Sequence, residues 1–400
     1  MNRKKIFAVI ITVAAVINST ACQSKEEKYH IKTKDAAYYD MSYNVYENGL
    51  LYTVPNASGT QACFLDYETM NGVPLCNKPN CTHSDSSCVS NFMVPVIYHD
   101  YVYWFASNYE IVDSQDGKSQ TADMHTKCMR ARLDTGLTET FAEIDGVYMQ
   151  NQIDLAIVND TMYIIGSKEI YQDETDGTWG GFSRSGEQYL YSINLDSAEV
   201  QNYGLINDAP TAKYNWSYGA SLWSEVKMEG IYHDKLYLYY RYVKDPQIII
   251  DYLNTDWVEN GSPRNDIPWI IENKCLDLKT GEITVSDLPY AWCIGENHYI
   301  YEENEKFFIL DEDGEKTAVE NMYDNETYDF TFVNNKLWKG SINQGFDVKT
   351  DEEFSISDKY ADKDAMIMDF VDNQYVVRYV ENNEVKFDRV SEQDFIGGAK

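Results

Sequence analysis

Four cysteines and one histidine lie close together in the first quarter of the chain, in and beside a segment rich in Asn, Pro, Ser and Asp. Cys76, Cys81, His83 and Cys88 follow one another at spacings of five, two and five residues, short enough to wrap one tetrahedral Zn²⁺ as a Cys₃His site. Alternatively, Cys63, Cys76, Cys81 and Cys88 form two disulfides, with three pairings that the sequence does not distinguish. We favour the disulfides by a narrow margin, because disulfides persist outside the cytoplasm and the chain carries an export signal.

Both alternatives make this cysteine cluster structural. A closed Cys₃His site leaves no open coordination position for catalysis, and two disulfides would tie down the loop. Cys63 would be spare in the zinc alternative, and His83 would be incidental in the disulfide alternative. A structural zinc is therefore the one cofactor that the sequence raises.

The sequence offers no catalytic residue that we can assign. It contains no Gly-x-Ser-x-Gly elbow, no His-Glu-x-x-His helix and no glycine loop that would hold a phosphate. His99 and His233 occupy a repeated turn position, where a backbone role is expected rather than general-base chemistry. Carboxylates are abundant enough to supply the pair that a glycosidase needs, so a carbohydrate-active enzyme stays as the alternative to a non-enzymatic protein.

A sequence pattern that repeats along the chain predicts the strands that position these residues. Seven times, a polar pair precedes alternating aromatic and aliphatic residues. These pairs are Asn48-Gly49, His99-Asp100, Asn159-Asp160, His233-Asp234, Glu296-Asn297, Asn334-Asn335 and Asp372-Asn373. Most units contain a second turn further on, such as Leu278-Lys279-Thr280-Gly281. Asn, Asp and Gly favour the left-handed conformations of two-residue hairpins, so each unit is predicted to be a small antiparallel sheet.

The spacing of the repeats predicts one fold. Successive first signals are 51, 60, 74, 63, 38 and 38 residues apart, and a four-stranded propeller blade needs about 40–50 residues. We therefore predict an all-β chain with a single β-propeller of antiparallel blades over residues 38–400, with seven blades preferred and six or eight allowed. A sandwich or jelly roll is the alternative, but neither repeats one hairpin signature seven times.

The longer spacings predict insertions near residues 107–127, 167–187, 210–226 and 244–268. Trp179, Trp216 and Trp257 lie in these insertions, where their rings could stack on a sugar or a peptide side chain. The alternative, which we slightly favour, is that the rings cap the apolar edges of enlarged blades.

The N-terminus predicts export and a lipid anchor. Arg3, Lys4 and Lys5 precede an apolar stretch over residues 6–17, which is too short to span a bilayer and is typical of a signal peptide. It closes with Ser-Thr-Ala before Cys22, which resembles the lipobox of bacterial lipoproteins, although the family usually has Leu where this chain has Ser19. We therefore predict a signal peptide over residues 1–21, a lipid on Cys22 and a polar tether over residues 22–37.

Taken together, the lipobox, the loop Cys76-x-x-Pro79-x-Cys81-x-His83 with its trailing Cys88, and the Tyr-rich repeats resemble a large group of uncharacterised cell-surface lipoproteins of Clostridia-type anaerobic bacteria. The resemblance covers nearly the whole chain after Cys22. It implies a surface-anchored β-propeller of unknown ligand and no established chemistry. An anaerobic habitat, which only the resemblance suggests, would weaken the case for disulfides.

Composition limits the partners. The chain of 400 residues has 33 Lys and Arg against 65 Asp and Glu, for a net charge of -32, which excludes general binding to nucleic acid. The 33 Tyr favour strands. We expect a monomeric ectodomain on the outer face of the cytoplasmic membrane, attached through the lipid on Cys22. Its expected role is to bind a glycan or protein without enzymatic activity.

Overall fold

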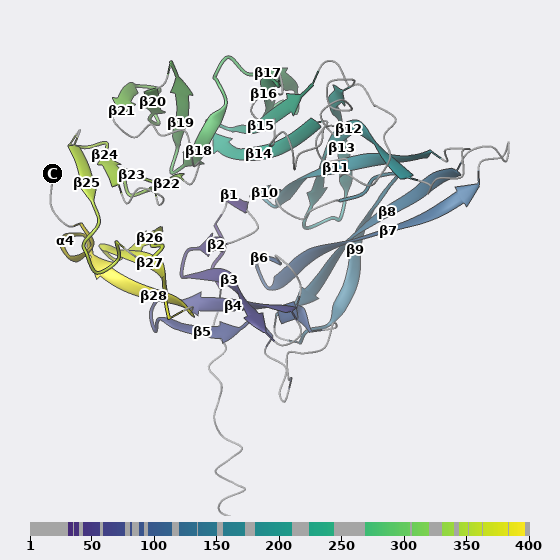
Figure 1. Ribbon diagram of the computed structural model, residues 1–400. Coiled ribbons are helices and arrows are strands. Elements are labelled where there is room, and N and C mark those ends of the chain that lie inside the picture. The colour runs from purple at the N-terminus through teal and green to yellow at the C-terminus, as the bar shows by residue number, and fades with distance from the viewer. Residues whose placement is uncertain are drawn as a thin grey trace, which may run out of the picture. The chain divides into compact units, whose positions relative to one another are not determined.

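The structure is a computed structural model. It describes residues 31–34, 36–39, 43–56, 59–76, 81, 88–91, 95–113, 120–133, 135–149, 155–172, 181–209, 224–243, 269–304, 306–319, 330–339, 344–350, 352–361, 363–382 and 384–396. Residues 1–30 form a separate unit from the compact unit Ile31–Lys400. Within that second unit, seven antiparallel sheets follow one another along the chain and form a ring, which is a seven-bladed β-propeller (Figure 1).

Each blade pairs its strands in chain order. Blade 1 consists of β2 (Tyr43–Tyr46), β3 (Gly49–Asn56), β4 (Gly59–Asp66) and β5 (Asn71–Pro74). Blade 2 consists of β6 (Val96–Tyr98), β7 (Tyr101–Asp113), β8 (Gln120–Arg132) and β9 (Thr138–Asp145). Blade 3 consists of β10 (Leu155–Val158), β11 (Thr161–Gln172), β12 (Gly181–Asn194) and β13 (Val200–Ala209). Blades 4 and 5 consist of β14 (Ser224–Tyr232), β15 (Lys235–Tyr242), β16 (Ile270–Asp277) and β17 (Ile283–Val285); and β18 (Ala291–Gly295), β19 (His298–Glu303), β20 (Lys306–Leu310) and β21 (Lys316–Val319). Blades 6 and 7 consist of β22 (Phe330–Val333), β23 (Lys336–Lys339), β24 (Gln344–Asp347) and β25 (Glu352–Ser355); and β26 (Met366–Val371), β27 (Gln374–Glu381) and β28 (Glu384–Ser391).

The repeated polar pairs form the tight turns between the first two strands of the blades, as predicted. Both turn residues have positive φ in blades 3 to 7, for example 48° and 58° at His233 and Asp234. This is the conformation that two-residue hairpins require, and it confirms that His99 and His233 are turn residues. In blade 1 the turn is Glu47-Asn48 rather than Asn48-Gly49, because Gly49 already pairs with Asp66 in the ladder.

The residues of the second turn signal also form hairpins, and in these turns a side chain hydrogen-bonds to the backbone. Asp277 Oδ1 accepts hydrogen bonds from the Lys279 and Thr280 backbone amides, both at 2.9 Å. In blade 5, Asp311 Oδ1 accepts hydrogen bonds from the Asp313 amide at 2.9 Å and from the Glu315 amide at 2.8 Å. A carboxylate that caps the turn in this way explains why Asp recurs at the end of the third strand.

The apolar cores lie between consecutive blades, and tyrosine side chains contribute to many of them. One core joins blades 4 and 5 through the buried rings of Tyr232, Tyr237 and Tyr299. Tyr hydroxyl groups also reach the next blade: Tyr232 donates to the Asp311 carbonyl at 2.6 Å, and Tyr46 accepts from the Ile97 amide at 2.9 Å. The high tyrosine content therefore serves contacts between blades.

A short strand before the first blade lies at the middle of the ring. Strand β1 (Ala36–Tyr39) does not join the last blade but pairs antiparallel with β10, the first strand of blade 3, in register Ala36 to Val158. It also contacts β2 and β14, the first strands of blades 1 and 4. Because the first strands line the ring's axis, β1 occupies part of its centre (Figure 1).

None of the described strands is shared between blades 7 and 1, since blade 1 has four strands of its own and blade 7 has three. After β28 the chain forms the short helix α4 (Glu392–Phe395), capped by Ser391, whose Oγ accepts from the Asp394 amide. Phe395 is fully buried there, and Ile396 bridges back to Ile356 after blade 6. The chain end thus joins blades 6 and 7.

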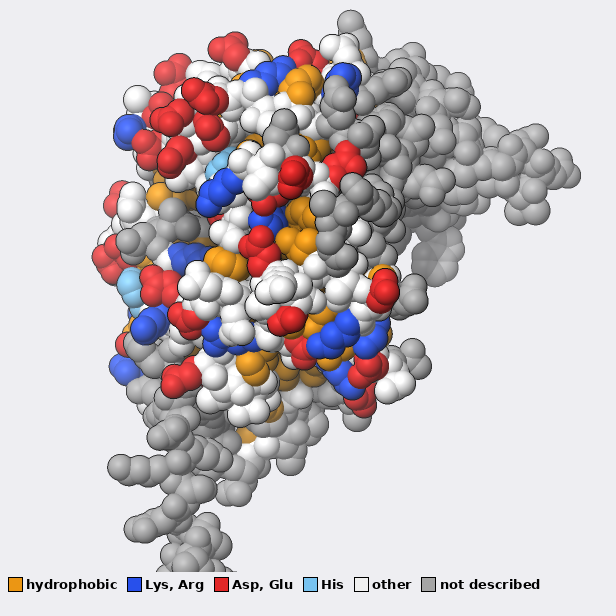
Figure 2. Space-filling view, turned by 90° about the vertical axis from the view of Figure 1, so that its left-hand side faces the viewer, with side chains coloured by type: hydrophobic (Ala, Val, Ile, Leu, Met, Phe, Trp, Pro, Cys, Tyr) orange, Lys and Arg blue, Asp and Glu red, His pale blue; other side chains and the backbone are white. Residues whose placement is uncertain are grey.

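Two blades carry much longer hairpins than the rest. The middle strands of blades 2 and 3 have 12 to 14 residues, whereas those of the other blades have 4 to 8. These long hairpins account for the insertions predicted near residues 107–127 and 167–187. On the face that Figure 2 shows, the described Lys and Arg side chains are interspersed with Asp and Glu.

Candidate functional site

The cysteine cluster occupies the connection between blades 1 and 2. Cys76 follows β5, and Cys88 precedes the 3₁₀ helix η1 (Val89–Asn91). The Sγ atoms of Cys76, Cys81 and Cys88 all lie within 4.8 Å of one another, and the Cys81 and Cys88 sulfurs are 3.6 Å apart. Cys76 and Cys88 are buried, and Cys81 is partly exposed. The fold thus brings together three of the five predicted residues.

Both ends of this loop are fixed to blade 1. The Leu75 amide donates to the Ala62 carbonyl on β4 at 3.0 Å. The Cys76 amide donates to Ser90 Oγ at 2.7 Å, and Ser90 is fully buried in η1, which packs on β4. These contacts hold the segments at Cys76 and Cys88 against β4, and none of them involves a sulfur atom.

Cys63 does not belong to the three-sulfur group. It lies on β4 opposite Tyr52 of β3, and burial raises the pKa of its thiol to about 11. Cys128 on β8 is similar, since burial raises its pKa to about 12. Thiols of this kind stay protonated at neutral pH and pack as small apolar side chains.

Several predicted site residues lie outside the described residues. They are Cys22, His83, Trp179, Trp216 and Trp257. Their roles stay predictions. None of the helices among the described residues is long and apolar enough to cross a membrane.

Glu229, on the first strand of blade 4, is a buried acid that sequence analysis missed. Neither carboxyl oxygen has a well-oriented hydrogen bond among the described residues. Burial raises the pKa of Glu229 well above its usual value, with the nearby Ala291 amide opposing the shift weakly. No second carboxylate is among the causes of this shift.

A β-bulge explains why Glu229 escaped notice. In sequence, Glu225, Lys227 and Glu229 alternate with apolar residues and predict one solvent-facing side of a strand. The register shifts between Met228 and Gly230, which leaves Glu229 as the extra residue and turns it inward. Gly230 was the available signal, because glycine inside a strand pattern often marks a bulge.

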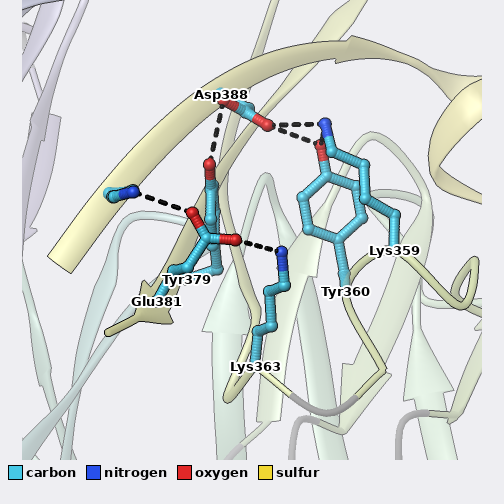
Figure 3. A network of polar contacts seen from close by, with 7 residues as sticks. Lys359, Tyr360, Lys363, Tyr379, Glu381 and Asp388 are labelled. Carbon is cyan, nitrogen blue, oxygen red and sulfur yellow. Dashed lines mark hydrogen bonds and ion pairs between the residues drawn. The ribbon is translucent and has the colours of Figure 1, made fainter. Parts of the chain in front are cut away.

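Two carboxylates of blade 7 are paired with lysine side chains. On blade 7, Asp388 accepts from Lys359 Nζ and from the Tyr360 hydroxyl, both at 2.8 Å (Figure 3). Glu381 binds Lys363 and Lys386, each at 2.7 Å, and these contacts lower its pKa to about 2. This network fastens the connector between blades 6 and 7 to β27 and β28, and its acids are ionised at neutral pH.

Comparison with known proteins finds distant structural similarity only. No family model and no curated protein matches the chain. Similar solved structures include TolB from Acinetobacter baumannii (9% identity, 86% of this chain and 64% of that chain, TM-score 0.30). Oligogalacturonate lyase from Vibrio parahaemolyticus is 9% identical over 90% of this chain and 89% of that chain, with a TM-score of 0.40. The β-propeller domain of the Trilobed protease from Pyrococcus furiosus is 11% identical over 89% and 81%, with a TM-score of 0.31. The chain spans less than two thirds of TolB, and scores this low carry no inference about activity.

Proposed function

We propose that this chain is a lipid-anchored propeller of the bacterial cell surface that binds a glycan or a protein without cleaving it. The lipid would be attached to Cys22 after removal of the signal peptide. The anchor would hold the acidic domain on a polar tether at the outer face of the cytoplasmic membrane.

The long hairpins of blades 2 and 3 carry this proposal. Strands β7, β8, β11 and β12 are longer than their counterparts in all other blades, so two neighbouring blades add surface beyond what the ring requires. Trp179 belongs to the connection between β11 and β12, where an aromatic face could stack on a ligand. Rigid blades that support variable loops are a common basis for recognition.

The charge states of three described carboxylates support the binding proposal. The pKa values of Asp388 and Glu381 are lowered by neighbouring lysines, and Glu229, whose pKa is raised, has no partner acid contributing to that shift. A glycosidase needs a raised acid and an ionised carboxylate about 5–9.5 Å apart. The centre of the ring is also partly filled by β1.

A glycan and peptide array with the purified chain tests the proposal, followed by product analysis on each ligand found. We expect binding without cleavage. Binding should weaken when the β7–β8 hairpin of blade 2 is shortened by an Asn-Gly turn that joins the paired residues Ile111 and Ala122. Trp179→Ala should weaken binding in the same way. Release of shorter glycans would establish the carbohydrate-active enzyme alternative. Unchanged binding by both variants would place the ligand elsewhere.

Mass spectrometry of the chain from its native host tests the anchor. The expected N-terminal residue is a lipidated Cys22, and Cys22→Ala should leave the chain without lipid and outside the membrane fraction. An unmodified N-terminus at another residue contradicts the proposal.

A further inference from the structure

We propose that Cys76, Cys81 and Cys88 bind one zinc ion, with His83 as the fourth ligand, so that the connection between blades 1 and 2 is a closed structural metal site. The first three ligands follow from the structure. The fourth follows from the sequence, because His83 comes two residues after Cys81 and lies outside the described residues.

The distances between the sulfurs suit a tetrahedral metal. With Zn–S bonds of about 2.3 Å, two thiolates on a tetrahedral ion lie about 3.8 Å apart. Cys81 Sγ and Cys88 Sγ are 3.6 Å apart, and Cys76 Sγ lies within 4.8 Å of both. Three sulfurs thus converge on one point, which a site for a single ion requires.

Disulfides fit the arrangement of these three sulfurs less well than a single metal ion does. A bond between any two of the three sulfurs leaves the third beside it, and two disulfides would need Cys63 as the fourth partner. Cys63 is outside the group and is held in the ladder of β4 between Tyr52 of β3 and Pro74 of β5. Moving its sulfur into the cluster would disturb the centre of blade 1.

Charge points to a cation of soft character. Cysteine sulfurs bind a metal as thiolates, and the positive charge of a dication would offset the repulsion between three thiolates bound this close together. Thiolate ligands select zinc, iron or Cu(I) over Mg²⁺ and Ca²⁺. A Cys₃His set with short spacings is typical of structural zinc, and no place is left for a substrate.

Metal analysis of the full chain, purified in detergent without added zinc, tests the proposal. We expect about one zinc per chain that survives dialysis against a weak chelator. Alkylation of the denatured protein without reductant, after a strong chelator, should label Cys76, Cys81 and Cys88. Iron in place of zinc, or no metal with these cysteines protected from alkylation, would overturn the proposal.

Variants assign the ligands. Cys81→Ser and His83→Ala should each weaken zinc binding at least tenfold, and His83→Cys should restore it as a Cys₄ site. The matched control is Cys63→Ala, which should keep a full equivalent of zinc. In the Co²⁺-loaded chain, the visible bands of a tetrahedral ion should shift when His83 becomes Cys, a change that a purely structural effect would not produce. Full zinc in His83→Ala together with an unchanged cobalt spectrum in His83→Cys would show that His83 is not a ligand and overturn the Cys₃His assignment.

Discussion

Arg389 of the last blade donates a hydrogen bond from Nη1 to the backbone carbonyl of Tyr67 in the first blade, at 2.8 Å. Its Nη2 also donates to Asp372 Oδ2 at 3.0 Å. Beside it, Tyr52 and Phe387 meet edge to face with centroids 4.8 Å apart. Since blades 7 and 1 share no strand among the described residues, these contacts close the ring together with the apolar core of Leu50, Leu65, Tyr67 and Val376.

Replacing Arg389 with Met should weaken this closure. Methionine keeps much of the packing but leaves the Tyr67 carbonyl without its charged donor, a loss of about 1.5–3 kcal/mol in the free energy of unfolding. Asp372→Asn removes the charge of the exposed ion pair but keeps a residue that tolerates the positive φ of this turn, so it should cost less than about 1 kcal/mol. Urea unfolding followed by tryptophan fluorescence measures both. Equal effects of the two variants would show that the Tyr67 contact does not matter for closure.

Glu229→Gln should change how stability depends on pH. Burial raises the pKa of Glu229 in the folded state, so the folded chain retains a proton that the unfolded chain loses above about pH 4.5. Stability is therefore lost as pH rises through this window, by at most about 1.4 kcal/mol per pH unit. The neutral glutamine removes that loss. We expect the variant to match the parent near pH 5 and to exceed it at pH 8.

The unfolding midpoint in urea across this range checks the prediction, with Glu303→Gln as the control at an exposed acid. A parent and variant that respond identically between pH 5 and pH 8 would contradict it.

Local turn chemistry made most of the fold predictable. Pairs such as Asn159-Asp160 adopt the left-handed conformation because their short polar side chains tolerate it, and repetition of the signal predicted the seven blades. The sequence placed Cys76, Cys81 and Cys88 in one short loop, and in the structure their sulfurs lie within 4.8 Å of one another. Nothing local specifies that β1 pairs with β10, because that register depends on a free strand edge made by distant residues.

Glu381 should produce the opposite pH dependence to Glu229. Hydrogen bonds from Lys363 and Lys386 lower its folded-state pKa to about 2, below the unfolded value of about 4.5. The stability that it contributes is therefore present above about pH 4.5 and lost as pH falls towards 2. Glu381→Gln should be less stable than the parent at pH 6 and equal to it near pH 2. Thermal unfolding at both pH values measures this, and a constant difference across the range would rule out the ion pairs as its cause.

Gly230 should tolerate no side chain, for two separable reasons. Its φ of +141° is rarely adopted by other residues, and an added Cβ would lie 2.9 Å from Ile294 Cβ on the neighbouring blade. Gly230→Ala should therefore combine conformational strain of about 1–2 kcal/mol with overpacking of about 1–3 kcal/mol.

Gly314 is the matched control, because its φ is +78° but nothing lies within 4 Å of an added Cβ. Gly314→Ala should show the strain alone, about 1–2 kcal/mol. Chemical denaturation of both variants gives the difference, which contains the contact with Ile294 together with the greater backbone strain at a φ of +141°. If the two variants lose the same stability, the contact between Gly230 and Ile294 is looser than the structure indicates.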